Sequence, residues 1–249
     1  PFYFLIEKKK SINEISKNKS KFFFYSVLIG FFLFLGSVFQ QVALIYTDVA
    51  NAAFFTIFYV PMVPIIVFFM FNKNIHWSVW PSVILCVIGG YLLTNFQDAT
   101  VRIGDTLVII GALFWSLHII FVGKIIKEFD APITIGLVQT IVVSLCSLIL
   151  AIIFEEFILK NILKQKIQIL YAGILSGGIA FVLQIYAQKN ISPAPSAIIF
   201  SLEGVFATVA AWVILSQILN INNILGCFFI LLGVLISQLA PLIKKASYK

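Results

Sequence analysis

Charged residues are scarce in this sequence. They make up 11% of its 249 residues, whereas a soluble domain carries about 25%. Arginine occurs once, at Arg102, and histidine only twice. This shortage excludes an ordinary soluble enzyme, a disordered chain and a nucleic-acid-binding protein. The three cysteines all lie in apolar stretches, so neither a disulfide framework nor a metal site is expected.

Apolar residues are correspondingly abundant, at 61% of the chain with a mean hydropathy of +1.07. They recur in blocks of roughly 20 residues, the length of a helix that crosses a bilayer. The pattern predicts an all-α polytopic integral membrane protein. The eight expected helices are Phe22–Tyr46, Val49–Phe71, Trp77–Asn95, Gly104–Gly123, Pro132–Phe154, Ile169–Ala187, Ser192–Leu215 and Ile221–Ile243.

The lysines predict the orientation of these helices. Thirteen of the 17 basic residues fall in the connections 7–21, 72–76, 124–131, 188–191 and the tail from Lys244. Alternating spans put all of these on one side, which the positive-inside rule assigns to the cytoplasm. We therefore expect a multi-pass protein of a bacterial inner membrane with a cytoplasmic C-terminus.

The sequence contains a weak internal repeat at a separation of 144 residues. Five identical pairs follow this offset, among them Gln40/Gln184 and Gly89/Gly233, and the edges of three apolar blocks coincide. Because the offset spans five helices, the two copies would cross the membrane in opposite senses. Such inverted repeats are typical of transporters whose substrate site lies near the midplane.

Three stretches carry a family pattern: Gln41–Thr56, Gly104–Leu107 with Ala112–His118, and Ser192–Phe206, although Gly204 stands where proline is common. They resemble the EamA family of the drug/metabolite transporter superfamily. The resemblance implies ten helices in two inverted five-helix units, a central cavity and transport of small organic solutes. It makes 1–103 the last three helices of the first repeat and 104–249 the complete second repeat, with two helices expected before residue 7.

Four polar residues inside the spans are candidate substrate-binding groups. Glu203 lies well within an apolar helix, where a charge costs at least about 2.5 kcal/mol. It could pair with a substrate amine, carry a proton, or tie helices together. His118 could meet a substrate carboxylate or be a structural imidazole. Gln40 and Gln184 could line the cavity or bridge helices.

Further candidates lie on the same helices. Tyr59, Trp115 and Phe200 are expected to form cavity walls, and Asn51 to reach the outer mouth. Asp48 is expected to cap the following helix. Pro61 and Pro64 should kink theirs, as a gate or as a static bend. The small residues at Gly173 and Gly177 permit close helix contact, and Gly226 and Gly233 could pack a homodimer.

The sequence thus predicts a secondary transporter, in the exporting direction, of a small organic metabolite such as an amino acid or amine. Its partners would be this solute and the lipid bilayer, and no cofactor is expected. Two alternatives stay open. One is a non-transporting receptor or assembly subunit, which would have no solute-sized polar cavity. The other is an intramembrane enzyme using Glu203 and His118, although the chain is expected not to be an enzyme.

Overall fold

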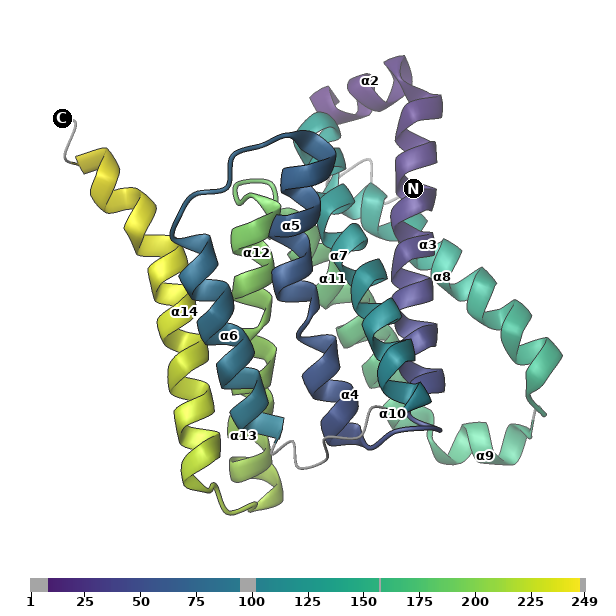
Figure 1. The fold of residues 1–249 in the computed structure, drawn as a ribbon. Coiled ribbons are helices and arrows are strands. Elements are labelled where there is room, and N and C mark those ends of the chain that lie inside the picture. Colours follow the sequence, from purple (N-terminus) through teal and green to yellow (C-terminus); the bar gives the residue numbers. More distant parts are fainter. Residues whose placement is uncertain (1–8, 95–101, 157, 247–249) are drawn as a thin grey trace. The chain divides into compact units, whose positions relative to one another are not determined.

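The computed structural model describes residues 9–94, 102–156 and 158–246 (Figure 1). Within these ranges the chain forms helices and no strands. It divides into two compact units. Unit 1 contains the described residues up to Leu35 together with Phe121–Ile191, and unit 2 contains Gly36–Ile120 and the described residues from Ser192 onward.

The helices of unit 1, some of which continue into unit 2, are α2 (Lys9–Lys17), α3 (Lys19–Ala43), α7 (Ile103–Phe129), α8 (Pro132–Phe154), α9 (Leu159–Lys164), α10 (Lys166–Leu170), the π-helix η1 (Tyr171–Ala180) and α11 (Phe181–Ala187). Those that lie in unit 2 alone are α4 (Val49–Thr56), α5 (Tyr59–Phe71), α6 (Val79–Thr94), α12 (Pro193–Phe200), α13 (Leu202–Leu215) and α14 (Ile221–Ala246).

These helices confirm the predicted all-α membrane architecture. Seven helical stretches in the described ranges are long and apolar enough to cross a bilayer. The eighth expected span, Trp77–Asn95, corresponds to the 16-residue apolar helix α6. The helix predicted over Pro132–Phe154 has those same bounds, because Pro132 occupies its first turn and proline is tolerated there.

Two expected boundaries differ clearly from the structure. The stretch before Lys19, expected as a connection, contains the amphipathic helix α2. The helix expected to end at Gly123 continues to Phe129, so Lys124 and Lys127 lie on a helix instead of in a loop. Block edges mark where apolar residues end, but a helix continues past that point as long as its backbone remains hydrogen-bonded.

The predicted span Val49–Phe71 is interrupted between α4 and α5, at Ile57 and Phe58. Pro61 explains the position, because a proline has no N–H and its ring clashes with the carbonyl four residues earlier, which is that of Ile57. The Ile57 carbonyl accepts instead from the N–H of Val60, at 2.9 Å. Pro64 lies inside α5 without ending it.

The span Ser192–Leu215 is also interrupted, at Ser201 between α12 and α13. The cause differs, because the residue four positions after Ser201 is Val205 and not a proline. The Ser201 hydroxyl donates to the carbonyl of Ile198 at 2.6 Å, and the Gly204 N–H donates to the Ser201 carbonyl at 3.2 Å. A serine that bonds back to its own helix in this manner favours a local bend.

Unit 1 has a continuous apolar core where α3, the end of α7, the start of α8 and α11 meet. Phe22 of α3 and Phe129 of α7 pack edge to face, with ring centroids 5.1 Å apart. Ile135 and Ile185 are fully buried beside them, and Ile15 of α2 packs against the same cluster. The core therefore fixes α2 to the rest of the unit.

In unit 2, α6 and α14 lie side by side (Figure 1). A Cβ atom on Gly226 would lie 2.7 Å from the carbonyl oxygen of Gly89, and one on Gly233 would lie 2.9 Å from that of Ser82. Gly226 and Gly233 thus pack against α6 of the same chain. The homodimer remains a prediction, but these two glycines are not available to form it. A Cβ on Gly173 would meet nothing within 4 Å, so the expected close contact is not made by the described residues.

We predict that Gly226→Ala destabilises the fold by about 1–3 kcal/mol, because the added methyl group overlaps a backbone oxygen that cannot move aside. The matched control is Gly173→Ala, which adds the same methyl group to open space. The unfolding midpoint in detergent micelles measures the effect. Equal midpoints for the two variants would contradict the close α6–α14 packing.

Candidate functional site

A cavity of about 770 Å³ lies within unit 2. Its walls come from α3, α4, α5, α6, α13 and the start of α14. It extends from the two helix interruptions to the end of the unit where α4 and α14 begin. A pocket of this size suits a small organic molecule, since ligand pockets measure about 300–1,000 Å³.

The inner part of the cavity is formed by residues at the two interruptions. Tyr59 and Ser201 line it and are almost fully buried, whereas the Glu203 residue remains accessible. Among the described residues that line the cavity, Glu203 alone is charged. The cavity therefore presents one carboxyl group beside an aromatic ring, an arrangement that favours a cationic group.

One wall of the cavity is a fixed polar pair. The Gln40 amide of α3 donates to the Thr56 hydroxyl of α4 at 3.1 Å. That hydroxyl in turn donates to the Ala52 carbonyl at 2.7 Å. Because Thr56 is tied to its own helix, it orients the Gln40 amide, which also lines the cavity.

The outer part of the cavity is framed by asparagines. Asn220 and Asn223 exchange backbone-to-side-chain hydrogen bonds of 3.1 and 2.9 Å at the start of α14. This reciprocal arrangement resembles a capping box and satisfies N–H groups at the helix end. Asn223 also donates to the Leu93 carbonyl of α6 at 3.4 Å, so the cap connects two walls.

A buried carboxylate fastens the α3–α4 connection. Asp105 of α7 is fully buried. It accepts hydrogen bonds from the Thr47 hydroxyl at 2.5 Å and from the Arg102 N–H at 2.8 Å. Asp48 occupies the cap position of α4, as expected, but its side chain makes no capping bond. It pairs instead with the Arg102 guanidinium at 2.5 Å.

The structure brings together only some of the candidates from the sequence. Gln40, Tyr59 and Glu203 line one cavity. Four further candidates belong to unit 2 without lining it: Asn51, Trp115, His118 and Phe200. Gln184 lies in unit 1.

His118 and Trp115 form a contact of their own. Their rings meet edge to face with centroids 6.2 Å apart, and His118 is fully buried. Trp115 packs beside Gly36, where a Cβ would come within 3.1 Å of its indole nitrogen. Asn51 is buried and its Nδ2 has no hydrogen-bond partner among the described residues.

Sequence reasoning missed Thr56, Ser201, Asn220 and Asn223 as cavity residues. A signal exists for the asparagines, because two polar residues three apart before an apolar run are typical of a helix start. No such signal marks Thr56 or Ser201, since single hydroxyl residues occur throughout apolar helices.

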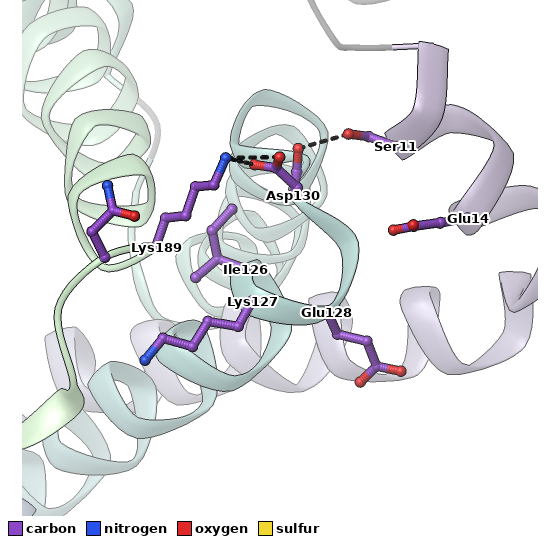
Figure 2. Close-up of a pocket in the computed structure, with 8 residues that line it drawn as sticks. Ser11, Glu14, Ile126, Lys127, Glu128, Asp130 and Lys189 are labelled. Atoms are coloured by element: carbon purple, nitrogen blue, oxygen red, sulfur yellow. Dashed lines mark hydrogen bonds and ion pairs between the residues drawn. The ribbon is translucent and has the colours of Figure 1, made fainter.

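A second pocket, of about 470 Å³, lies in unit 1 (Figure 2). Asp130, which has a left-handed backbone conformation at the end of α7, lines it. The Lys189 ammonium lies 2.6 Å from the Asp130 carboxylate, and the Ser11 hydroxyl donates to the Asp130 carbonyl at 2.9 Å. These contacts tie α2 to the connections that follow α7 and α11. The Asp130–Lys189 ion pair distinguishes this pocket from the cavity of unit 2, whose described lining holds one charged residue.

The match to a known family covers residues 102–239, more than half of the chain, and the family is the EamA-like transporter family. The chain belongs to this family. It is a membrane transporter in general terms, and the membership agrees with its apolar spans.

Relatives of known sequence support this assignment. An uncharacterized transporter of Archaeoglobus fulgidus is 30% identical over 211 residues, which cover 85% of this chain and 67% of the relative. One of Clostridium kluyveri is 26% identical over 212 residues, covering 79% and 66%. The chain thus spans about two thirds of the length of these proteins. A WAT1-related protein of Arabidopsis thaliana is 27% identical, over 49% of this chain and 32% of its own length.

The fold itself is also found in a solved crystal structure. That protein superposes with a TM-score of 0.69 over 93% of this chain and 84% of its own, at 15% sequence identity. At this identity, the likeness concerns the fold alone.

We predict that Asp105→Ala destabilises the protein by about 1–3 kcal/mol, because two buried donors lose their acceptor. Asp48→Ala is the matched control. It removes a carboxylate that is 68% exposed, and an exposed ion pair contributes under about 1 kcal/mol. Unfolding midpoints in detergent measure both. A larger loss for Asp48→Ala would overturn the role of the buried carboxylate.

Proposed function

We propose that this protein is a secondary transporter that exports a small organic amine or amino acid, with Glu203 as the group that binds the amine. The observation that carries the proposal is the single carboxyl group in the unit 2 cavity. In the described lining no lysine, arginine or histidine accompanies it. A solute ammonium group or a proton would supply the missing positive charge.

The rest of the lining fits such a solute. Tyr59 offers an aromatic face for a cation, and the Gln40 amide offers both a donor and an acceptor. A carboxylate on the solute would find amides but no basic side chain in the described lining. The site therefore favours amines over dicarboxylic or phosphorylated solutes.

Alternating access is proposed from the direction in which the cavity opens. It reaches the end of unit 2 that carries Asp48 and Asn220. The lysine distribution predicts this end to lie outside, with the C-terminus in the cytoplasm of a bacterial cell. The interruptions at Ile57 and Ser201 are the points at which the two helices could bend as the cavity closes, with Pro61 fixing the first.

Two features disfavour the alternatives. A non-transporting receptor or assembly subunit was expected to lack a polar cavity that touches both Glu203 and Gln40, yet one cavity is lined by both. An intramembrane enzyme would need two cooperating polar groups within reach. His118 does not share the cavity with Glu203.

The experiment that identifies the solute uses the full-length gene product in a bacterial host. Metabolites in the medium and in the cells are profiled for the wild type and for Glu203→Ala. We expect one class of amine or amino acid to move into the medium only with the intact protein. If no solute moves although the protein is folded in the membrane, the receptor alternative replaces transport.

We predict that Glu203→Gln lowers transport of that solute by about tenfold or more, because the solute cation loses its charged partner in the cavity. Transport into vesicles is measured between pH 5 and 8. Glu156→Gln is the control, since Glu156 is an exposed residue between α8 and α9. A Glu203→Gln protein that transports normally over this whole range rules out both amine pairing and proton coupling by Glu203.

We further predict that Gln40→Leu weakens transport more than Gln184→Leu does. The two glutamines are repeat mates, but Gln40 lines the cavity with Glu203, whereas Gln184 lies in unit 1. Comparing the KM values of the two variants checks the difference. An equal rise in both would contradict the assignment of the solute site to the unit 2 cavity.

A further inference from the structure

The junction of α2 and α3 forms a bent segment, here called the elbow, that comprises residues 17–25. Figure 1 shows α2 lying across the end of α3. Two contacts hold this arrangement. The Ser11 hydroxyl of α2 bonds to the Asp130 carbonyl at 2.9 Å (Figure 2), and Lys21 of α3 forms an ion pair with Glu128. The elbow is therefore a fixed part of unit 1.

A hollow of about 550 Å³ lies at the elbow. Lys17, Lys19 and Lys21 line it together with Phe24 and Tyr25. The side chains of Lys17 and Lys19 are exposed, and neither has an ion-pair partner in the described part of the chain. Only Lys21 is neutralised, by Glu128. The hollow thus carries a local excess of positive charge.

A further cation lies next to this hollow. The Lys124 ammonium of α7 donates to the Tyr25 hydroxyl at 3.0 Å and lies 4.7 Å from the centre of its ring. Because Lys124 is held in this position, Tyr25 and the lysines form one basic surface. Such a surface attracts phosphate groups.

Exposed apolar side chains continue from the hollow along α3. Phe24, Val27 and Phe31 are 63%, 45% and 44% exposed. Their spacing of three and four residues places them on one face of the helix. A ligand that fits both parts has a negatively charged head and an apolar tail. A free phosphate ion would use only the lysines.

We propose that the elbow binds the headgroup phosphate of an anionic phospholipid, with the acyl chains lying along the Phe24–Phe31 face of α3. An amphipathic helix that lies in the membrane surface with lysines beside a span is suited to such lipids. The lysine-rich side is also the side predicted to face the cytoplasm. The elbow does not include Glu203, so this proposal does not depend on the identity of the transported solute.

The test measures the Kd of short-chain phosphatidylglycerol for the whole chain in neutral detergent, by calorimetric titration. We expect Lys17→Gln/Lys19→Gln to weaken binding by about thirtyfold, the effect expected for two lysine charges at a lipid surface. The matched control, Lys160→Gln/Lys164→Gln, removes two exposed lysines from α9 and should leave the Kd unchanged. Far-UV circular dichroism checks that both variants are folded.

Two further ligands distinguish binding of a lipid headgroup from binding of a free phosphate ion. Phosphatidylcholine should bind far more weakly than phosphatidylglycerol, and inorganic phosphate should not compete. If inorganic phosphate competes as well as the lipid does, the site is a phosphate site and the lipid proposal is wrong. If the α9 control loses as much affinity as the elbow variant, attraction by overall charge replaces the elbow site. Should the double variant fail to fold, Lys17→Gln alone is compared with Lys160→Gln.

Discussion

A backbone carbonyl inside a bilayer must find a hydrogen-bond donor within the protein, and this requirement governs where the spans of this chain can bend. Two spans of unit 2 are interrupted nonetheless. At the first, Pro61 cannot serve the Ile57 carbonyl, and the Val60 N–H takes its place. At the second, the Ser201 hydroxyl and the Gly204 N–H serve the nearby carbonyls. These local hydrogen bonds reduce the cost of interrupting a span within lipid, and Ile57 and Ser201 both line the cavity.

The two interruptions are themselves related, because Ile57 and Ser201 are 144 residues apart, the separation of the proposed repeat. The two interruptions have different local causes, a proline at the first and a back-bonding serine at the second. Their equivalent positions are therefore not the result of one repeated residue, which favours the proposed repeat. Two residues further on, the copies diverge in charge, with Tyr59 in the first and Glu203 in the second. If the repeat is present, its two copies differ at the position of the proposed solute-binding group. In the proposed function one carboxyl group pairs with the solute cation, whereas two would repel each other when both are ionised.

Much of this architecture could be predicted from the sequence, because a bilayer imposes its thickness on every span. The apolar pattern predicts the helix Pro132–Phe154 to the residue, and polar or aromatic residues inside apolar spans identify Glu203, Gln40 and Tyr59 as candidates. Other features depend on contacts that no local pattern contains. α2 owes its place to Ile15 in the unit 1 core and to the Ser11–Asp130 bond. His118 lies on a helix as apolar as that of Gln40, and only the packing within unit 2 shows that it does not line the cavity. Helical periodicity identifies a face, but it does not say which neighbour covers that face.

The ion pairs of the described residues lie at helix ends, whereas the Glu203 carboxyl group lies inside a span. Arg102 with Asp48, Lys189 with Asp130, and Lys21 with Glu128 all pair at helix ends, where water is near and the cost of charge is small. Glu203 differs, because it lies well inside a span and has no ion-pair partner among the described residues. A carboxylate there is expensive unless a cation or a proton accompanies it. A solute that brings the positive charge would therefore be held most strongly while it is inside the cavity, and its departure would leave Glu203 in need of a proton or of another cation. Under the proposed function, exchange of one cation for another would meet this requirement without any further charged residue in the described lining of the cavity.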